Sequence, residues 1–387
     1  MLINDNKKPR VVVAMSGGVD SSVAAFLLKK KGLDVIGIFL KLSLGSESGL
    51  YKARQTAEML SIPFYVIDLS GDFKEKVVDY YISEYEKGRT PNPCVVCNKL
   101  IKFGLLWDKA RGLGADFLAT GHYARLRRVN SKFKSQNLKF RSSDLRQKNY
   151  YIFRARDEKK DQSYYLWSID KRIISHLVFP LGNMKKEEVK RIARKAKLPI
   201  GERESQGACF FAKGENKRFL SSFAKKLKKE GNIIDREGNI LGKHKGLIYY
   251  TIGQREGLGD SIAAQWNKFQ TTSNGPQKNF KRNPSPLYVI GLDIKKNQLI
   301  VGENKDIFTK ELKADSLNIL DEKIFNMNNK NIYAQVRGGH EAQKCKIISI
   351  DKKNIFLEFK KPIRAVTPGQ SVVFYDGGQM LGGGVIK

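Results

Sequence analysis

The chain has 387 residues, enough for two or three domains with cores of their own. Its 71 Lys and Arg against 39 Asp and Glu give a formal net charge of +32. This excess favours a polyanionic partner, and a general lysine-rich bias is the alternative. No apolar run approaches the ~20 residues of a membrane span, and the N-terminus has no signal-peptide pattern. We therefore expect a cytoplasmic protein with no membrane partner.

The first two hundred residues alternate between strand-like and helix-like segments. The pattern predicts strands at 11–15, 35–40, 64–67 and 117–119, and helices at 21–31, 51–60, 73–85 and 99–113. Such alternation is typical of the α/β class, a doubly wound parallel sheet that binds ligands at the carboxyl ends of its strands. Two further helices are predicted at 185–197 and 212–229.

The rest of the chain has a different character. Residues 128–150 form a basic insertion, which is either an arm that touches RNA or a solvated segment. A polar stretch at 262–283 is typical of a loop, and alternating segments from 286 onward predict a small antiparallel barrel. We divide the chain into a catalytic domain (1–207), a central domain (208–283) and a C-terminal β-barrel (284–387).

The motif AMSGGVDSS at 14–22 lies between a predicted strand and a predicted helix. Its two glycines let the backbone approach an anion, and the following helix adds a positive dipole end. The hydroxyls that can donate to phosphate oxygens belong to Ser16, Ser21 and Ser22. Asp20 suits a Mg²⁺ that bridges phosphates. Without the lysine of an ordinary P-loop, the motif resembles the loop of ATPases that release pyrophosphate; a ligand-free turn is the alternative.

Four cysteines are present, at positions 94, 97, 209 and 345. In a reducing compartment so few cysteines favour catalysis or metal binding over structural disulfides. Cys97 is predicted at or near the start of a helix over 98–113, where the helix dipole favours thiolate. Three interpretations stay open: buried apolar thiols, half of a zinc site, or a persulfide carrier with a nucleophile that closes a transient disulfide.

Nine motifs in combination resemble the tRNA-specific 2-thiouridylases of the pyrophosphate-loop ATPase superfamily. These are AMSGGVDSS, GIFLK, TPNPCVVCNKLIKF, ATGHYAR, KDQSYYL, FPLG, SQGACFF, YTIGQREGLG and AVTPGQSVVFY. The resemblance covers the chain from about residue 10 to its end, apart from the insertions near 130–150 and 262–283. It implies an adenine nucleotide alpha hydrolase-like fold and ATP-dependent 2-thiolation of the wobble uridine in tRNAs for Lys, Glu and Gln.

The resemblance also implies roles for individual residues. Cys97 is the nucleophile and Cys209 carries the persulfide. ATP lies against Ala14, Met15, Ser16, Gly17, Gly18, Val19, Asp20, Ser21, Leu40 and Gly121. The target base lies beside Asn92, Pro93 and Cys94, and tRNA contacts His122, Lys160, Asp161, Gln162, Arg337, Gly338 and Gln370. The implied partners are tRNA and a cysteine desulfurase or sulfur-relay protein, and we expect a monomer.

Two positions depart from the family pattern. Cys94 stands where many members have an aspartate with an acid/base role, and Gly338 stands where they have an aromatic residue. Cys94 opens an alternative in which Cys94, Cys97 and Cys209 hold an iron–sulfur cluster, although a persulfide remains the preferred carrier. Two other functions stay as alternatives: a small-molecule ligase of the same superfamily and a non-catalytic RNA-binding protein.

Overall fold

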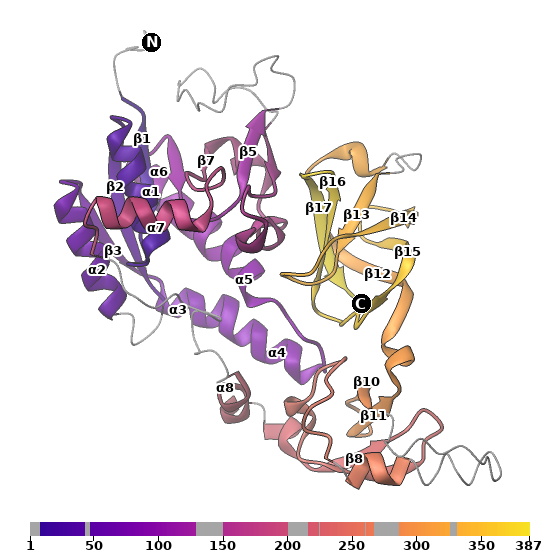
Figure 1. Ribbon diagram of the computed structural model, residues 1–387. Coiled ribbons are helices and arrows are strands. Elements are labelled where there is room, and N and C mark those ends of the chain that lie inside the picture. The colour runs from indigo at the N-terminus through magenta and orange to yellow at the C-terminus, as the bar shows by residue number, and fades with distance from the viewer. Residues whose placement is uncertain are drawn as a thin grey trace.

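The computed structural model describes residues 8–42, 47–128, 150–199, 216–223, 225–259, 261–266, 286–325 and 331–387. An α/β domain, a small central β-domain and a C-terminal barrel follow one another along the chain (Figure 1). Cys209 and almost all of the basic insertion lie outside the described residues. Within the described ranges, no helix combines the length and the apolar character that a membrane span requires.

The α/β domain contains a five-stranded sheet in the order β3-β2-β1-β4-β7, and every pairing in it is parallel. The strands are β1 (Arg10–Ala14), β2 (Asp34–Lys41), β3 (Phe64–Asp68), β4 (Phe117–Ala119) and β7 (Leu177–Val178). Val12 is buried in one hydrophobic cluster, whereas Val11 and Val13 are buried in another on the opposite face. The predicted doubly wound α/β fold is therefore confirmed. Strand order reverses between β1 and β4, where such sheets bind ligands.

Helices cover the sheet and extend from it (Figure 1). They are α1 (Val19–Lys30), α2 (Glu47–Met59), α3 (Ser70–Phe73), η1 (Lys74–Asp79), α4 (Tyr80–Glu86), α7 (Lys186–Lys195) and the short turns η4 (Glu158–Lys160), η5 (Ser163–Leu166) and η6 (Lys171–His176). The segments α3, η1 and α4 join end to end. They carry Tyr81 and Tyr85 into the hydrophobic core of the central domain.

One helical segment carries both Cys94 and Cys97. It consists of α5 (Pro93–Val96), η2 (Cys97–Leu105) and α6 (Leu106–Gly112), with η2 wound as a π-helix. The helix begins at Pro93, because proline lacks the amide hydrogen that the first turn would leave unpaired. The prediction of a helix start near Cys97 is thus wrong. Cys97 lies one turn inside the helix, and the dipole argument applies to Cys94 instead.

The central domain contains a four-stranded sheet in the order β10-β11-β8-β9. Its elements are α8 (Asn216–Phe223), η7 (Lys225–Lys228), β8 (Gly231–Ile234), β9 (Ile240–His244), η8 (Leu247–Tyr249), β10 (Tyr288–Asp293) and β11 (Gln298–Gly302). The alternation of residues 288–302 predicts strands correctly but assigns them to the barrel. In the structure β11 pairs with β8, because period-two alternation identifies a strand without specifying its partner.

The C-terminal domain is an antiparallel barrel in the order β12-β15-β14-β13-β16-β17, closed by pairing of β12 with β17. Its elements are η9 (Asn304–Ile307), β12 (Phe308–Ile319), η10 (Glu322–Phe325), β13 (Ile332–Gln335), β14 (Gln343–Ile350), β15 (Ile355–Arg364), β16 (Ser371–Asp376) and β17 (Gln379–Ile386). The predicted barrel is confirmed. A hairpin of the α/β domain, β5 (Arg125–Arg128) and β6 (Tyr150–Phe153), pairs with β17 and so attaches the barrel.

Candidate active site

The phosphate loop follows the carboxyl end of β1 and leads into α1, as the sequence predicts. Gly17 has a φ of 75°, and a Cβ there would lie 2.1 Å from the carbonyl oxygen of Gly49. Both facts require glycine. The Ser21 hydroxyl accepts from the Ser16 amide at 3.1 Å and donates to the Gly18 carbonyl at 3.1 Å. The loop is therefore shaped by its own hydrogen bonds.

Two residues of the motif face the protein interior. Ser22 is fully buried, and its hydroxyl lies 3.3 Å from that of Thr56 on α2. The prediction that Ser22 donates to phosphate is therefore wrong. Met15 is also buried, and its amide donates to the Ile38 carbonyl at 2.8 Å as a continuation of the strand. Only its backbone borders the loop.

Two residues distant in sequence come to the same edge of the sheet. Gly121 follows β4, and a Cβ at this position would lie 2.8 Å from the Asp20 carbonyl carbon and from the Ser21 amide nitrogen. Leu40, near the carboxyl end of β2, packs against the hydrophobic cluster that contains Cys97. The fold therefore brings the nucleotide loop and the Cys97 helix to one edge, where parallel strands place their ligands.

Asp20 takes part in a network that sequence reasoning missed. The Lys186 ammonium at the start of α7 lies 2.7 Å from Asp20 Oδ1 and 2.8 Å from Oδ2. The Tyr123 hydroxyl donates to Oδ1 at 2.8 Å, and Asp157 Oδ2 accepts from the Lys186 amide at 2.8 Å. In sequence Lys186 follows another lysine in a basic helix, so nothing there distinguishes it.

The described cysteines occupy different environments. Cys97 is buried among Leu69, Phe73, Val77 and Ile101, and Cys94 is half-buried. Because Cys97 is buried, a reaction at its sulfur requires an opening of the site.

Cys345 lies in the barrel core, where burial raises the pKa of its thiol to about 12. It is therefore unsuited to nucleophilic chemistry.

The KDQ turn, predicted to contact tRNA, also attaches the barrel to the catalytic domain. The Asp161 carboxylate accepts from the Arg154 guanidinium at 3.2 Å, from the Ala155 amide at 2.9 Å and from the Ser163 hydroxyl at 2.8 Å. Its side chain is only 7% exposed. Gln162 Oε1 accepts from the Tyr123 amide at 2.9 Å. Of the predicted trio, Lys160 is the exposed member.

The other predicted tRNA contacts lie at the junction of the domains or near the loop. Gln370 Nε2 donates to the Thr90 carbonyl at 2.8 Å, which ties the barrel to the segment that precedes Cys94. Arg337 is exposed. His122 Nδ1 lies 2.8 Å from the Thr120 hydroxyl. Desolvation, and then the charge of Lys102, hold the pKa of His122 well below 6.5.

The space beside Gly338 is filled by the Tyr165 side chain from the catalytic domain. A Cβ at this position would lie 2.2 Å from the Tyr165 hydroxyl oxygen and 2.9 Å from its ring carbon Cζ. Burial raises the pKa of Tyr165, and Cys94 adds to this effect while Arg337 opposes it. Tyr165 thus places an aromatic ring beside Gly338, the position at which the family pattern has an aromatic residue and this chain has glycine.

Comparison with known proteins agrees with this geometry. Three family domains match: "tRNA methyl transferase HUP domain" at residues 9–213, "tRNA methyl transferase PRC-barrel domain" at 217–303 and "Aminomethyltransferase beta-barrel domain" at 309–386. The chain is 40% identical over 396 residues to the tRNA-specific 2-thiouridylase MnmA of Clostridium acetobutylicum, covering 99% of this chain and 100% of that one. The chain belongs to the tRNA-specific 2-thiouridylase family.

Other similarities are consistent with membership of the tRNA-specific 2-thiouridylases. A 2-thiouridylase of Caldanaerobacter subterraneus is 40% identical over 392 residues, covering 98% of each chain. Among solved structures, the U34-tRNA thiolase NcsA of Methanococcus maripaludis, described with its [4Fe-4S] cluster, has a TM-score of 0.34 and 16% identity over 72% of this chain and 77% of that one. That likeness is too low to carry an inference about this chain.

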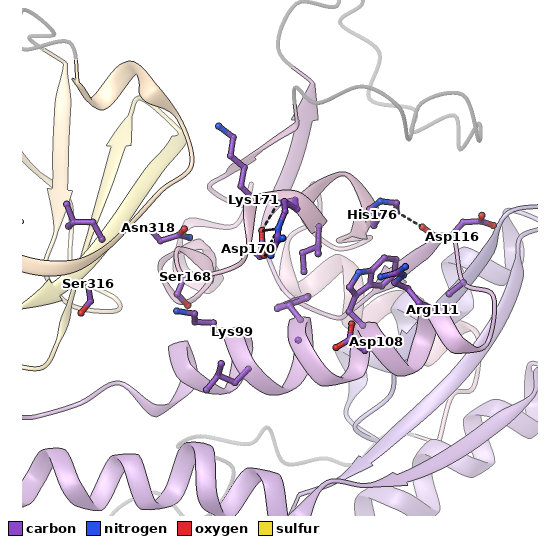
Figure 2. Close-up of a pocket in the computed structure, with 18 residues that line it drawn as sticks. Lys99, Asp108, Arg111, Asp116, Ser168, Asp170, Lys171, His176, Ser316 and Asn318 are labelled. Atoms are coloured by element: carbon purple, nitrogen blue, oxygen red, sulfur yellow. Dashed lines mark hydrogen bonds and ion pairs between the residues drawn. The ribbon is translucent and has the colours of Figure 1, made fainter. Parts of the chain in front are cut away.

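A cavity of about 990 Å³ lies away from the residues that family membership implies. Asp116 precedes β4 and His176 precedes β7, so this cavity opens at the amino edge of the sheet, opposite the phosphate loop. Figure 2 shows His176 bonded to the Asp116 carbonyl, at 3.0 Å, with Asn318 of the barrel forming the other wall. None of the predicted 2-thiouridylase site residues lines it.

The donors near the phosphate loop limit how the Mg²⁺ expected beside Asp20 could be held. In the part of the chain that the structure describes, no group of three His, Cys, Asp or Glu side chains can hold a metal ion. Asp20 offers a carboxylate on the first turn of the helix that follows the loop, which fits a Mg²⁺ that arrives with nucleotide phosphates rather than a resident ion. The cluster alternative needs Cys209, which lies outside the described residues.

Proposed function

We propose that this protein uses ATP to activate a uridine of tRNA and then replaces the O2 oxygen of that base with sulfur. The observation that carries the proposal is the meeting, at one edge of the sheet, of the phosphate loop and the helix that bears Cys94 and Cys97. Membership of the tRNA-specific 2-thiouridylase family supports it. The wobble uridine is the proposed target, and its base must leave the anticodon stack to reach this edge.

In the activation step the uridine O2 attacks the α-phosphorus of ATP. A new O–P bond forms and the bond to pyrophosphate breaks, so the poor leaving oxygen becomes part of AMP. The amides at the start of α1 and the glycines of the loop bind the phosphates. The loop suits this role because hydrogen bonds between Ser16 and Ser21 hold its shape.

In the transfer step a persulfide on Cys209 delivers its outer sulfur to C2, and AMP leaves with the O2 oxygen. Cys97 attacks the inner sulfur of Cys209, so that a disulfide forms between the two residues as the outer sulfur is released. A cellular dithiol then reduces this disulfide. Sulfur enters from a cysteine desulfurase or a relay protein. Cys94, a half-buried neighbour on the same helix, borders the base in this scheme.

The deciding experiment measures sulfur incorporation into unmodified tRNA by mass spectrometry of its nucleosides. Cys97→Ser and Cys209→Ser are expected to abolish incorporation, while Cys345→Ser, the matched control with a buried and protonated thiol, retains it. Full activity of either of the first two variants would overturn the two-cysteine mechanism. Stoichiometric iron and sulfide after anaerobic purification, together with iron-dependent turnover, would favour the cluster instead.

A further inference from the structure

Lys186 is a buried charge that the proposed chemistry does not yet use. Its side chain is 6% exposed, whereas the Asp20 carboxylate that it contacts is 34% exposed. Burying an ammonium ion is costly unless a counter-charge accompanies it, and here one carboxylate accepts from it with both oxygens. Asp20 lies on the first turn of α1, next to the phosphate loop, and Lys186 lies at the start of α7.

The Asp20–Lys186 pair neutralises a charge that would otherwise oppose ATP. A lone carboxylate on the first turn of α1 would repel phosphate oxygens bound to the same loop. A permanent ion pair has the opposite drawback, because an ammonium held against both oxygens of Asp20 repels a metal ion that approaches the same carboxylate. A Mg²⁺ beside Asp20 would be shared with the phosphates of ATP, because among the described residues no three His, Cys, Asp or Glu side chains come together to hold it.

The surrounding contacts allow one partner to move and hold the other still. The backbone of Lys186 is held by a hydrogen bond from its amide to the Asp157 carboxylate. Its ammonium is at the end of a flexible four-carbon side chain. The Tyr123 hydroxyl also donates to Asp20 Oδ1, at 2.8 Å, so the carboxylate has a second partner besides the ammonium. A rotation of the lysine side chain therefore suffices to exchange partners.

We propose that Lys186 is an exchangeable counter-ion of the phosphate loop. In the nucleotide-free protein it neutralises Asp20; when ATP binds, its ammonium turns to a phosphate oxygen and leaves the carboxylate to the metal that accompanies ATP. This inference rests on the proposed use of ATP, but not on the sulfur chemistry.

The test compares Lys186→Met with Lys190→Met, a more exposed lysine on the same helix. Calorimetry measures ATP affinity in the presence of Mg²⁺, and water proton relaxation measures the affinity for Mn²⁺ alone. In Lys186→Met we expect ATP affinity to fall at least tenfold and Mn²⁺ affinity without ATP to rise at least threefold, because Asp20 loses its competing cation. Lys190→Met should match the wild type in both.

A fall in ATP affinity together with a rise in Mn²⁺ affinity distinguishes exchange from a merely structural role of Lys186. Loss of both affinities, or an unchanged value of either one, would overturn the proposal. Asp20→Asn in the Lys186→Met background should remove the gain in Mn²⁺ affinity. If Lys186→Met does not fold, Lys186→Arg serves instead, because it keeps the positive charge. Its Mn²⁺ affinity should equal that of the wild type, and a higher Mn²⁺ affinity would refute competition between the side-chain cation and the metal for Asp20. Absence of ATP binding by the wild type would instead sink the proposed function.

Discussion

Asp161→Asn tests whether the KDQ turn contacts tRNA through its carboxylate or acts by holding the barrel in place. In the structure Asp161 accepts from Arg154, which also donates to Gln335 at 2.9 Å and lies 3.8 Å from the centre of the Tyr375 ring. Because Gln335 and Tyr375 belong to the barrel, Asp161 fixes the guanidinium that joins the two domains. We expect the variant to loosen this junction.

The magnitude follows from burial. Removing one partner of a buried ion pair costs about 3–5 kcal/mol. Asparagine keeps one oxygen for the Ala155 amide, and Arg154 is 25% exposed and keeps its two barrel contacts, so the cost is reduced. We therefore expect the free energy of unfolding to fall by about 2 kcal/mol.

Urea unfolding of Asp161→Asn, together with the salt dependence of tRNA binding, checks this reasoning. The matched control is Lys160→Gln, at the adjacent exposed position. If Lys160 meets a phosphate, the control lowers the slope of log K against log salt by about 1 and leaves unfolding unchanged. Asp161→Asn should show the reverse pattern. A loss of tRNA affinity by Asp161→Asn with an unchanged free energy of unfolding would refute our interpretation.

Three further predictions concern single residues. Gly338→Ala should reduce tRNA affinity, because its Cβ would displace Tyr165. Adding Tyr165→Phe to this variant should restore only part of the affinity, since ring carbon Cζ still lies 2.9 Å from that Cβ. Filter binding of the single and double variants checks both expectations. Cys345 should resist iodoacetamide at pH 8 in the native protein, because burial raises its pKa to about 12, and mass spectrometry of labelled peptides would contradict this if Cys345 were alkylated. The lowered pKa of His122 means that the unfolded chain takes up a proton at this residue at a higher pH than the folded protein does. The free energy of unfolding should therefore decrease as the pH falls below about 6.5, by about 1 kcal/mol at pH 5.5. A His122→Gln variant with the same pH dependence would show that another group is responsible.

The sequence predicts the nucleotide loop because every part of it is local. Gly17, Gly18 and Asp20 lie within four positions of one another, between a strand and a helix, and the structure places them as expected. The network around Asp20 is not predictable in this way. Lys186 lies 166 positions from Asp20, and only the packing of α7 against α1 brings them together.

Other differences arise where a pattern is correct but incomplete. The alternation of residues 288–302 fixes their strand character, while the choice between the central sheet and the barrel depends on partners that the pattern does not contain. The helix start at Pro93 was missed because the apolar periodicity is clear only after Cys97. Asp161 is a similar case, since the resemblance implies a role for the KDQ turn without indicating which side chains face inward.

The attachment of the barrel explains why so many implied tRNA contacts also have structural partners. Tyr164 donates to the Ser371 carbonyl at 2.9 Å, and the Ser163 hydroxyl lies 3.0 Å from that of Tyr375. On the catalytic side, Asn98 donates to the Tyr165 carbonyl at 2.9 Å from the helix that carries Cys97. One short turn therefore contacts both the catalytic helix and the barrel. A substitution in this turn therefore alters contacts to the Cys97 helix and to the barrel together.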